Sequence, residues 1–72
     1  MTANSPRRLE GVVSSFDDHV GLGQVTADDG RTWLFHCIAI ADGSRSIEIG
    51  ARVDFELMPK MGQFEARDLR PS

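Results

Sequence analysis

The chain has 72 residues, a formal net charge of −3 at pH 7 and a single cysteine. This length suits one small domain, since two cores built from so few residues would each bury too little apolar surface to fold. One cysteine cannot form an internal disulfide, and no set of cysteines and histidines has the spacing of a zinc site. We therefore expect packing alone to stabilise the fold, with no metal and no cofactor.

The sequence shows no signal for export or for a membrane. Its N-terminal residues lack the apolar core of a signal peptide, and no stretch approaches the roughly 20 apolar residues of a membrane span. We therefore expect a cytoplasmic protein with no membrane partner. The net negative charge gives no overall attraction toward phosphate groups, although a local cluster of lysines and arginines would still attract them.

Taken in chain order, a polar and flexible arm over residues 1–8 comes first, then one domain over residues 9–70 and a short tail over residues 71–72. Turn-forming residues divide the domain into five segments with the β-branched, aromatic or alternating composition of strands. The predicted strands are Leu9 to Phe16, Leu22 to Ala27, Thr32 to His36, Arg52 to Met58 and Gln63 to Leu69. A helical turn is favoured only at residues 38–41.

Two turns predict hairpins, namely Asp29-Gly30 between the second and third segments and Met61-Gly62 between the fourth and fifth. Five short antiparallel strands in so small a domain must hide their edges, and partial closure does this with the least chain. We therefore predict an all-β fold, a five-stranded antiparallel barrel.

Alternation along the strands predicts which side chains face the core, because successive residues point to opposite faces of a sheet. In the third segment, the bulkier aromatic pair is the better candidate for the inward face. The predicted core contains Val13, Val25, Trp33, Phe35, Val53, Phe55 and Leu57. The same rule leaves an outward set on the second and third segments, made of Leu22, Gln24, Leu34 and His36.

The second segment begins with two glycines, Gly21 and Gly23, on either side of Leu22. Such spacing suggests a backbone that is approached closely, either by another strand or by a flat ligand. A phosphate-binding loop is not expected, because neither a helix start nor a lysine follows. We assign the two glycines to close strand packing.

Short motifs run in order through most of the chain. They are Leu9-Glu10-Gly11-Val12-Val13, Phe16-Asp17, Gly21-Leu22-Gly23-Gln24-Val25, Asp28-Asp29-Gly30, Leu34-Phe35-His36, Ala39-Ile40 and Gly50-Ala51-Arg52-Val53-Asp54-Phe55, followed by Gly62 and Ala66. This series resembles the cold shock domain family. The resemblance implies a Greek-key barrel of the oligonucleotide-binding (OB) type that binds single-stranded RNA and DNA without catalysis. Several family members act as RNA chaperones.

The family binds bases by stacking them on aromatic rings, and the resemblance carries two ligand-facing rings to this chain, Phe16 and His36. Other side chains stand at the remaining ring positions, namely Ser15, Leu22, Gln24, Leu34 and Cys37, and Val20 replaces a usual lysine. Each stacked ring contributes about 1–3 kcal/mol, so we expect weaker binding than is usual in the family.

The predicted nucleic-acid site combines the matching rings with the outward set and two flanking cations. Its residues are Phe16, Leu22, Gln24, Leu34, His36, Arg31 and Arg45. A leucine side chain can pack against the face of a base, and a glutamine amide can hydrogen-bond to base edges. The arginines would contact phosphates in a salt-dependent way.

A second hypothesis fits the same residues. If the barrel is retained and the ligand lost, Leu22 and Leu34 form an exposed apolar patch for a protein partner or a homodimer. Catalysis is not expected, because the neighbours His36 and Cys37 point to opposite faces of a strand and no nucleophile, base and oxyanion site come together. Turn chemistry explains the acidic pairs at residues 17–18 and 28–29.

Overall fold

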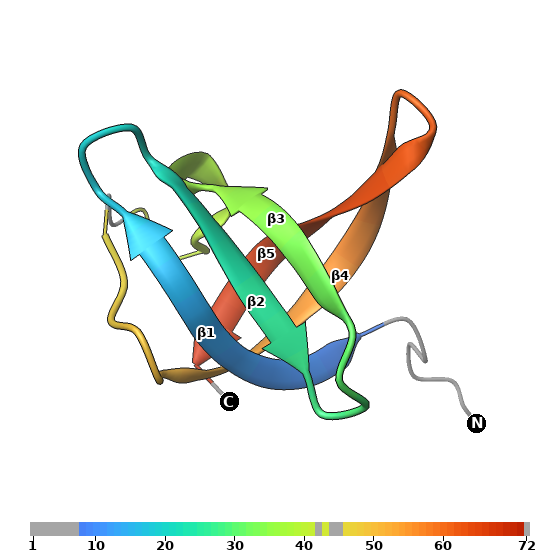
Figure 1. The fold of residues 1–72 in the computed structure, drawn as a ribbon, viewed down its shortest axis with the longest axis horizontal. Coiled ribbons are helices and arrows are strands. Elements are labelled where there is room, and N and C mark those ends of the chain that lie inside the picture. Colours follow the sequence, from blue (N-terminus) through green and yellow to red (C-terminus); the bar gives the residue numbers. More distant parts are fainter. Residues whose placement is uncertain (1–7, 42, 44–45, 72) are drawn as a thin grey trace.

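The computed structural model describes residues 8–41, 43 and 46–71 of the chain. Within these residues five antiparallel strands form one sheet (Figure 1), namely β1 (Leu9–Asp17), β2 (Leu22–Ala27), β3 (Thr32–His36), β4 (Arg52–Lys60) and β5 (Gln63–Pro71). A single 3₁₀ turn, η1 (Cys37–Ala39), follows β3. The predicted all-β class and all five strands are confirmed, and β1, β4 and β5 end slightly later than predicted. None of the helical structure in the described residues is long and apolar enough to span a membrane.

The strands lie in the order β3-β2-β1-β4-β5, so β1 is central and pairs with β2 on one side and β4 on the other. In Figure 1 the β4–β5 hairpin crosses behind the layer formed by β1, β2 and β3 and extends beyond it. The two edge strands, β3 and β5, contact each other, but no ladder joins them in the described residues. Near this seam, an isolated parallel bridge joins Ile40 to Leu69, and the Ala41 amide donates to the Leu69 carbonyl at 2.8 Å.

The core lies between the two layers and is apolar throughout. Its buried residues are Val13, Val25, Ala27, Phe35, Ile40, Val53, Phe55, Ala66 and Leu69. Trp33 and Leu57 are partly buried against this cluster, and the Trp33 ring meets the Phe55 ring edge-on at 6.0 Å between centroids. The inward face predicted from strand alternation is therefore confirmed.

Both predicted hairpins are present. In the β4–β5 turn, Met61 and Gly62 have φ values of 49° and 85°. Two successive left-handed residues match the right-handed twist of the flanking strands, and this geometry favours glycine at the second position. In the β2–β3 turn, Gly30 has a φ of 94° and its amide donates to the Ala27 carbonyl at 2.9 Å.

Arg8, predicted to be the last residue of the polar arm, joins β4 to β5. Its Nε donates to Asp54 Oδ1 at 2.8 Å, and its guanidinium also donates to the Asp68 carboxylate at 2.8 Å and the Asp68 carbonyl at 2.9 Å. Asp68 has a φ of 55° and lies near the point where the β4–β5 register shifts, between Asp54 and Glu56. The arginine therefore fixes an irregular stretch of β5 by hydrogen bonds to both its side chain and its backbone.

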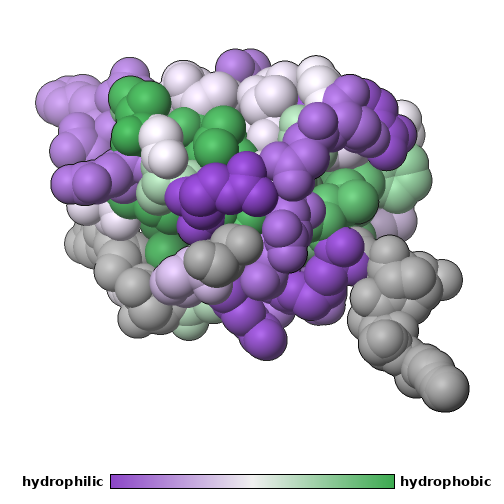
Figure 2. All heavy atoms as spheres, turned by 90° about the horizontal axis from the view of Figure 1, so that it is seen from below, coloured by the Kyte–Doolittle hydropathy of each residue, from purple (hydrophilic) through white to green (hydrophobic). Residues whose placement is uncertain are grey.

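Figure 2 views the molecule from the side on which β2 ends and the β2–β3 turn lies. Hydrophilic atoms cover most of this side, with hydrophobic atoms visible between them.

Arg52, at the start of β4, forms ion pairs with two acidic side chains. Its Nη1 lies 2.9 Å from Asp28 Oδ1, and its Nη2 lies 3.5 Å from Glu10 Oε1. The hydrogen bond from Arg52 lowers the pKa of Asp28. Arg52 is therefore neutralised by neighbouring carboxylates.

We expect the folded state to lose stability in acid. Desolvation disfavours the charged form of Asp68, but the hydrogen bond from Arg8 and the charge of Arg70 outweigh it and lower the pKa of Asp68 below its usual 3.8. A carboxyl whose pKa is lower in the folded state stabilises the fold above pH 3.8 and loses this contribution as the pH falls through the folded-state pKa. Thermal unfolding between neutral and strongly acidic pH measures the effect.

The variant Asp68→Asn tests this assignment, because asparagine tolerates the left-handed backbone at this position and removes only the charge. We expect Asp68→Asn to unfold at a lower temperature than the wild type at neutral pH. The difference between the two proteins should shrink in acid, where the wild-type carboxyl is protonated. A difference that stays constant across the pH range would contradict the assignment.

Candidate nucleic-acid interface

The outward set predicted on β2 and β3 forms one surface, here called the outer patch and made of Leu22, Gln24, Leu34 and His36. Leu22 pairs with His36, and Gln24 pairs with Leu34, in the β2–β3 ladder. All four residues are exposed. Side chains directly opposite one another in a ladder lie about 5 Å apart at Cβ, so the four make a continuous surface. That surface offers two aliphatic groups, one amide and one imidazole.

The structure separates Phe16 from the outer patch. The β1–β2 register shifts between Val13 and Ser15, and beyond this bulge Phe16 pairs with Gly23 on the core side of β2. The Phe16 ring stacks on the buried Phe35 ring with centroids 5.8 Å apart and planes 10° from parallel. Phe16 therefore packs at the border of the core, instead of joining the outward residues as the resemblance implied.

The bulge in β1 determines which of its side chains lie beside the outer patch. Its extra residue is Ser14, whose hydroxyl donates to the Gln24 carbonyl at 3.2 Å and accepts from the Thr26 hydroxyl at 2.9 Å. After the bulge, Ser15 pairs with Gln24 and Asp17 pairs with Leu22. The outer patch is thus bordered on the β1 side by small polar or acidic side chains, none of which stacks on a base.

Gly23 is the residue that permits the Phe16–Phe35 stack. A Cβ atom at this position would lie 2.7 Å from Phe35 Cζ, 2.7 Å from the Ser15 carbonyl oxygen and 2.8 Å from Phe16 Cδ1. Two of these neighbours are rings and the third is backbone, so little of this crowding can relax. The predicted use of this glycine for close packing is confirmed.

Of the two predicted flanking cations, Arg31 lies at the β2–β3 turn and Arg45 lies outside the described residues. The Arg31 guanidinium carbon is 5.0 Å from the centroid of the Trp33 ring, and Arg31 Nε is 2.9 Å from Asp29 Oδ2. The hydrogen bond from the Arg31 backbone amide lowers the pKa of Asp29 and keeps its carboxylate charged. Arg31 is therefore held beside Trp33 and paired with an acid, away from His36.

The structure adds an exposed ring that is not among the predicted site residues. Phe64, near the start of β5, is 54% exposed and lines a hollow of about 280 Å³ beside β3, here called the ring hollow. The other residues that line the ring hollow are Gln24, Thr32, Trp33, Leu34, Gln63 and Glu65. The outer patch and the ring hollow share Gln24 and Leu34, so they form one surface that now carries an exposed aromatic side chain.

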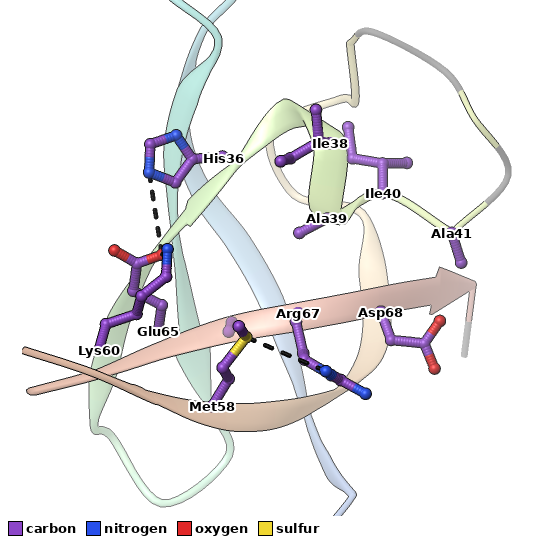
Figure 3. A pocket seen from close by; sticks show the side chains of 11 residues that line it. His36, Ile38, Ala39, Ile40, Ala41, Met58, Lys60, Glu65, Arg67 and Asp68 are labelled. Carbon is purple, nitrogen blue, oxygen red and sulfur yellow. Dashed lines mark hydrogen bonds and ion pairs between the residues drawn. The ribbon is translucent and has the colours of Figure 1, made fainter.

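A larger open groove of about 560 Å³ lies between η1 and the β4–β5 hairpin (Figure 3), here called the η1 groove. Ile38 and Met58 supply apolar parts of its lining, and His36 and Lys60 supply nitrogen donors. Figure 3 shows His36, Lys60 and Glu65 gathered at one end of the groove. Glu65 lines both the η1 groove and the ring hollow, so these two depressions meet at its side chain.

In the part of the chain that the structure describes, no three His, Cys, Asp or Glu side chains are grouped to hold a metal ion. Cys37 is a free, half-buried thiol. Its sulfur would lie 3.0 Å from a Cβ atom added at Gly21, where φ is +74°. The thiol therefore fills the space beside the left-handed glycine that ends the β1–β2 connection.

A search with protein-family models and a search of curated proteins both find no match to this chain.

We expect Gly23→Ala to lower the free energy of unfolding by about 1–3 kcal/mol, the usual effect of adding a methyl group to a packed interior. Urea unfolding monitored by the fluorescence of Trp33 measures the change. Gln24→Ala is the matched control, because it alters the next residue of β2 on the exposed face, where substitutions change stability by about 0.5 kcal/mol or less. Equal stability of Gly23→Ala and the wild type would contradict the packing described here.

Proposed function

We propose that the protein binds single-stranded nucleic acid, without catalysing a reaction, on the surface formed by the outer patch and the ring hollow. The observation that carries this proposal is the exposed Phe64 ring beside Leu34 and Gln24. A nucleobase has apolar faces and polar edges, so an aromatic ring, an aliphatic side chain and an amide suit its faces and its edge. Because every base has a face that can stack, this surface accepts RNA and DNA with little sequence preference.

We propose further that the sheet is a Greek-key barrel of the OB type, as the resemblance to cold shock domains implies. The approach of β3 to β5, the Ile40–Leu69 bridge and a core shared by residues of both layers support closure across the seam. OB barrels bind oligonucleotides on the face of their second and third strands. The outer patch occupies that face here.

The composition of the surface sets the expected strength of binding. It holds one exposed phenyl ring, one imidazole and the partly buried indole of Trp33 among aliphatic and polar side chains, and each stacked base contributes about 1–3 kcal/mol. We therefore propose weak to moderate affinity that falls as salt is added. Weak, sequence-tolerant binding of this kind suits transient contact with RNA, as in an RNA chaperone.

Titration of fluorescent oligothymidylate and oligouridylate at low ionic strength tests the proposal. We expect Phe64→Ala to weaken binding about fivefold to more than a hundredfold, which corresponds to the loss of one stacked base. His36→Ala should weaken it as well. Ile49→Ala is the matched control, because Ile49 is 64% exposed but lies in the connection before β4, away from the proposed surface.

Two outcomes would contradict the proposal. Absence of binding by the wild type at low ionic strength would refute nucleic-acid binding. Equal affinities of Phe64→Ala and Ile49→Ala would show that the ligand does not occupy the ring hollow.

The aliphatic character of the outer patch favours a second candidate, a protein-interaction or dimerisation module. Leu22 and Leu34 are 38% and 47% exposed and lie on adjacent strands. A partner that covers them would leave no room for a nucleic-acid strand. Sedimentation distinguishes the candidates, because a stable dimer that Leu34→Asp dissociates would support this module and remove the surface required for nucleic-acid binding.

A further inference from the structure

We propose that His36 and Lys60 form a binding site for a backbone phosphate, and that the Glu65 carboxylate occupies this site in the free protein. This inference rests on the proposed function, because it assigns a position to one phosphate of the bound strand. Glu65 would then compete with the ligand, and its charge would set how tightly the protein binds.

Side chains from three strands meet at one carboxylate oxygen of Glu65. Glu65 Oε1 on β5 lies 3.8 Å from His36 Nε2 at the end of β3 and 3.8 Å from Lys60 Nζ at the end of β4. Figure 3 shows the imidazole of His36 directed toward the adjacent side chains of Lys60 and Glu65. A single anionic oxygen is thus placed between two nitrogen donors, an arrangement that a phosphate oxygen can adopt equally well.

The contacts of Glu65 are loose enough for a ligand to replace them. Both distances exceed the usual hydrogen-bond length, and the side chains of His36 and Lys60 are 49% and 44% exposed, whereas that of Glu65 is 24% exposed. Ion pairs that are this long and have one exposed partner contribute little to stability, so their loss costs the folded protein little. A phosphate brings more acceptor oxygens than the carboxylate and can contact both donors at shorter range.

The position of Glu65 relates this site to the path of the strand. Glu65 lines both the ring hollow and the η1 groove. A strand that stacks one base on Phe64 and continues toward η1 must pass over this residue. With the carboxylate in place, the strand meets a like charge, so the carboxylate must rotate away before His36 and Lys60 can contact the phosphate.

The variant Glu65→Gln tests the proposal while keeping the shape of the side chain. We expect oligothymidylate to bind about threefold more tightly to this variant than to the wild type, the change that corresponds to one exposed ion pair. The plot of log affinity against log salt should become steeper by about 0.7, because Lys60 becomes free to release one more counterion from the strand. Thermal unfolding verifies that the variant is folded.

Glu48→Gln is the matched control, because it removes the same charge from an exposed position in the connection between η1 and β4. We expect this control to leave the affinity and its salt dependence close to those of the wild type. An equal gain from Glu48→Gln would mean that only net charge matters, and this outcome would overturn the proposal.

Lys60→Gln, alone and combined with Glu65→Gln, tests the pairing itself. If Lys60 contacts the phosphate that Glu65 blocks, the gain from Glu65→Gln shrinks when Lys60 is absent. An undiminished gain would overturn the assignment of Lys60.

The two proposals fail in different ways. If the wild type binds and Phe64→Ala weakens binding while Glu65→Gln matches Glu48→Gln, only the phosphate site is refuted. If neither the wild type nor any variant binds at low ionic strength, nucleic-acid binding is refuted and the phosphate site with it.

Discussion

The stack of Phe16 on Phe35, made possible by the missing side chain of Gly23, fixes which face of β2 and β3 looks outward. Successive side chains of a strand alternate between faces, so a slip of one residue would turn Gln24 and His36 into the core. Burying those polar groups without partners would cost more than a small domain can offset. The packing of two rings on one side of the sheet therefore determines the chemistry that is presented on the other.

The strands, both hairpins and most of the core could be predicted because they depend on local signals, namely alternation with period two and glycine at turns. The resemblance implied a ligand-facing Phe16, but the bulge at Ser14 shifts the register and directs this ring toward Phe35, and no glycine or proline in the sequence marks the bulge. Phe64 was missed because it has the same parity as the buried Ala66, which predicts an inward ring, and its exposure in the ring hollow depends on how β5 lies beside β3. The position of Glu65 between two other strands is likewise a tertiary property that no local pattern encodes.

The positive side chains of the described surface are paired with carboxylates. Every lysine and arginine in the described part of the chain has a carboxylate oxygen within 4.0 Å, the six being Arg8, Arg31, Arg52, Lys60, Arg67 and Arg70. An anionic ligand therefore meets cations that already have partners. It gains the most binding free energy at an exposed cation whose existing ion pair is long. The pair of Lys60 and Glu65 is 3.8 Å long and its lysine is exposed, whereas Arg8 is held by several short hydrogen bonds in a half-buried position.

Within the described residues no ladder joins β3 to β5, so we expect the structure to open more easily along this seam than between paired strands. Backbone amides that face this seam are not held in a ladder between β3 and β5, so they should exchange with deuterated solvent sooner than the amides of β1. Opening along the seam would spread the β4–β5 hairpin from the front layer while the pairs between β1 and its neighbours stay intact. Such opening would give one small scaffold an adjustable width, and under the proposed function this width would let the same surface take both the larger purines and the smaller pyrimidines.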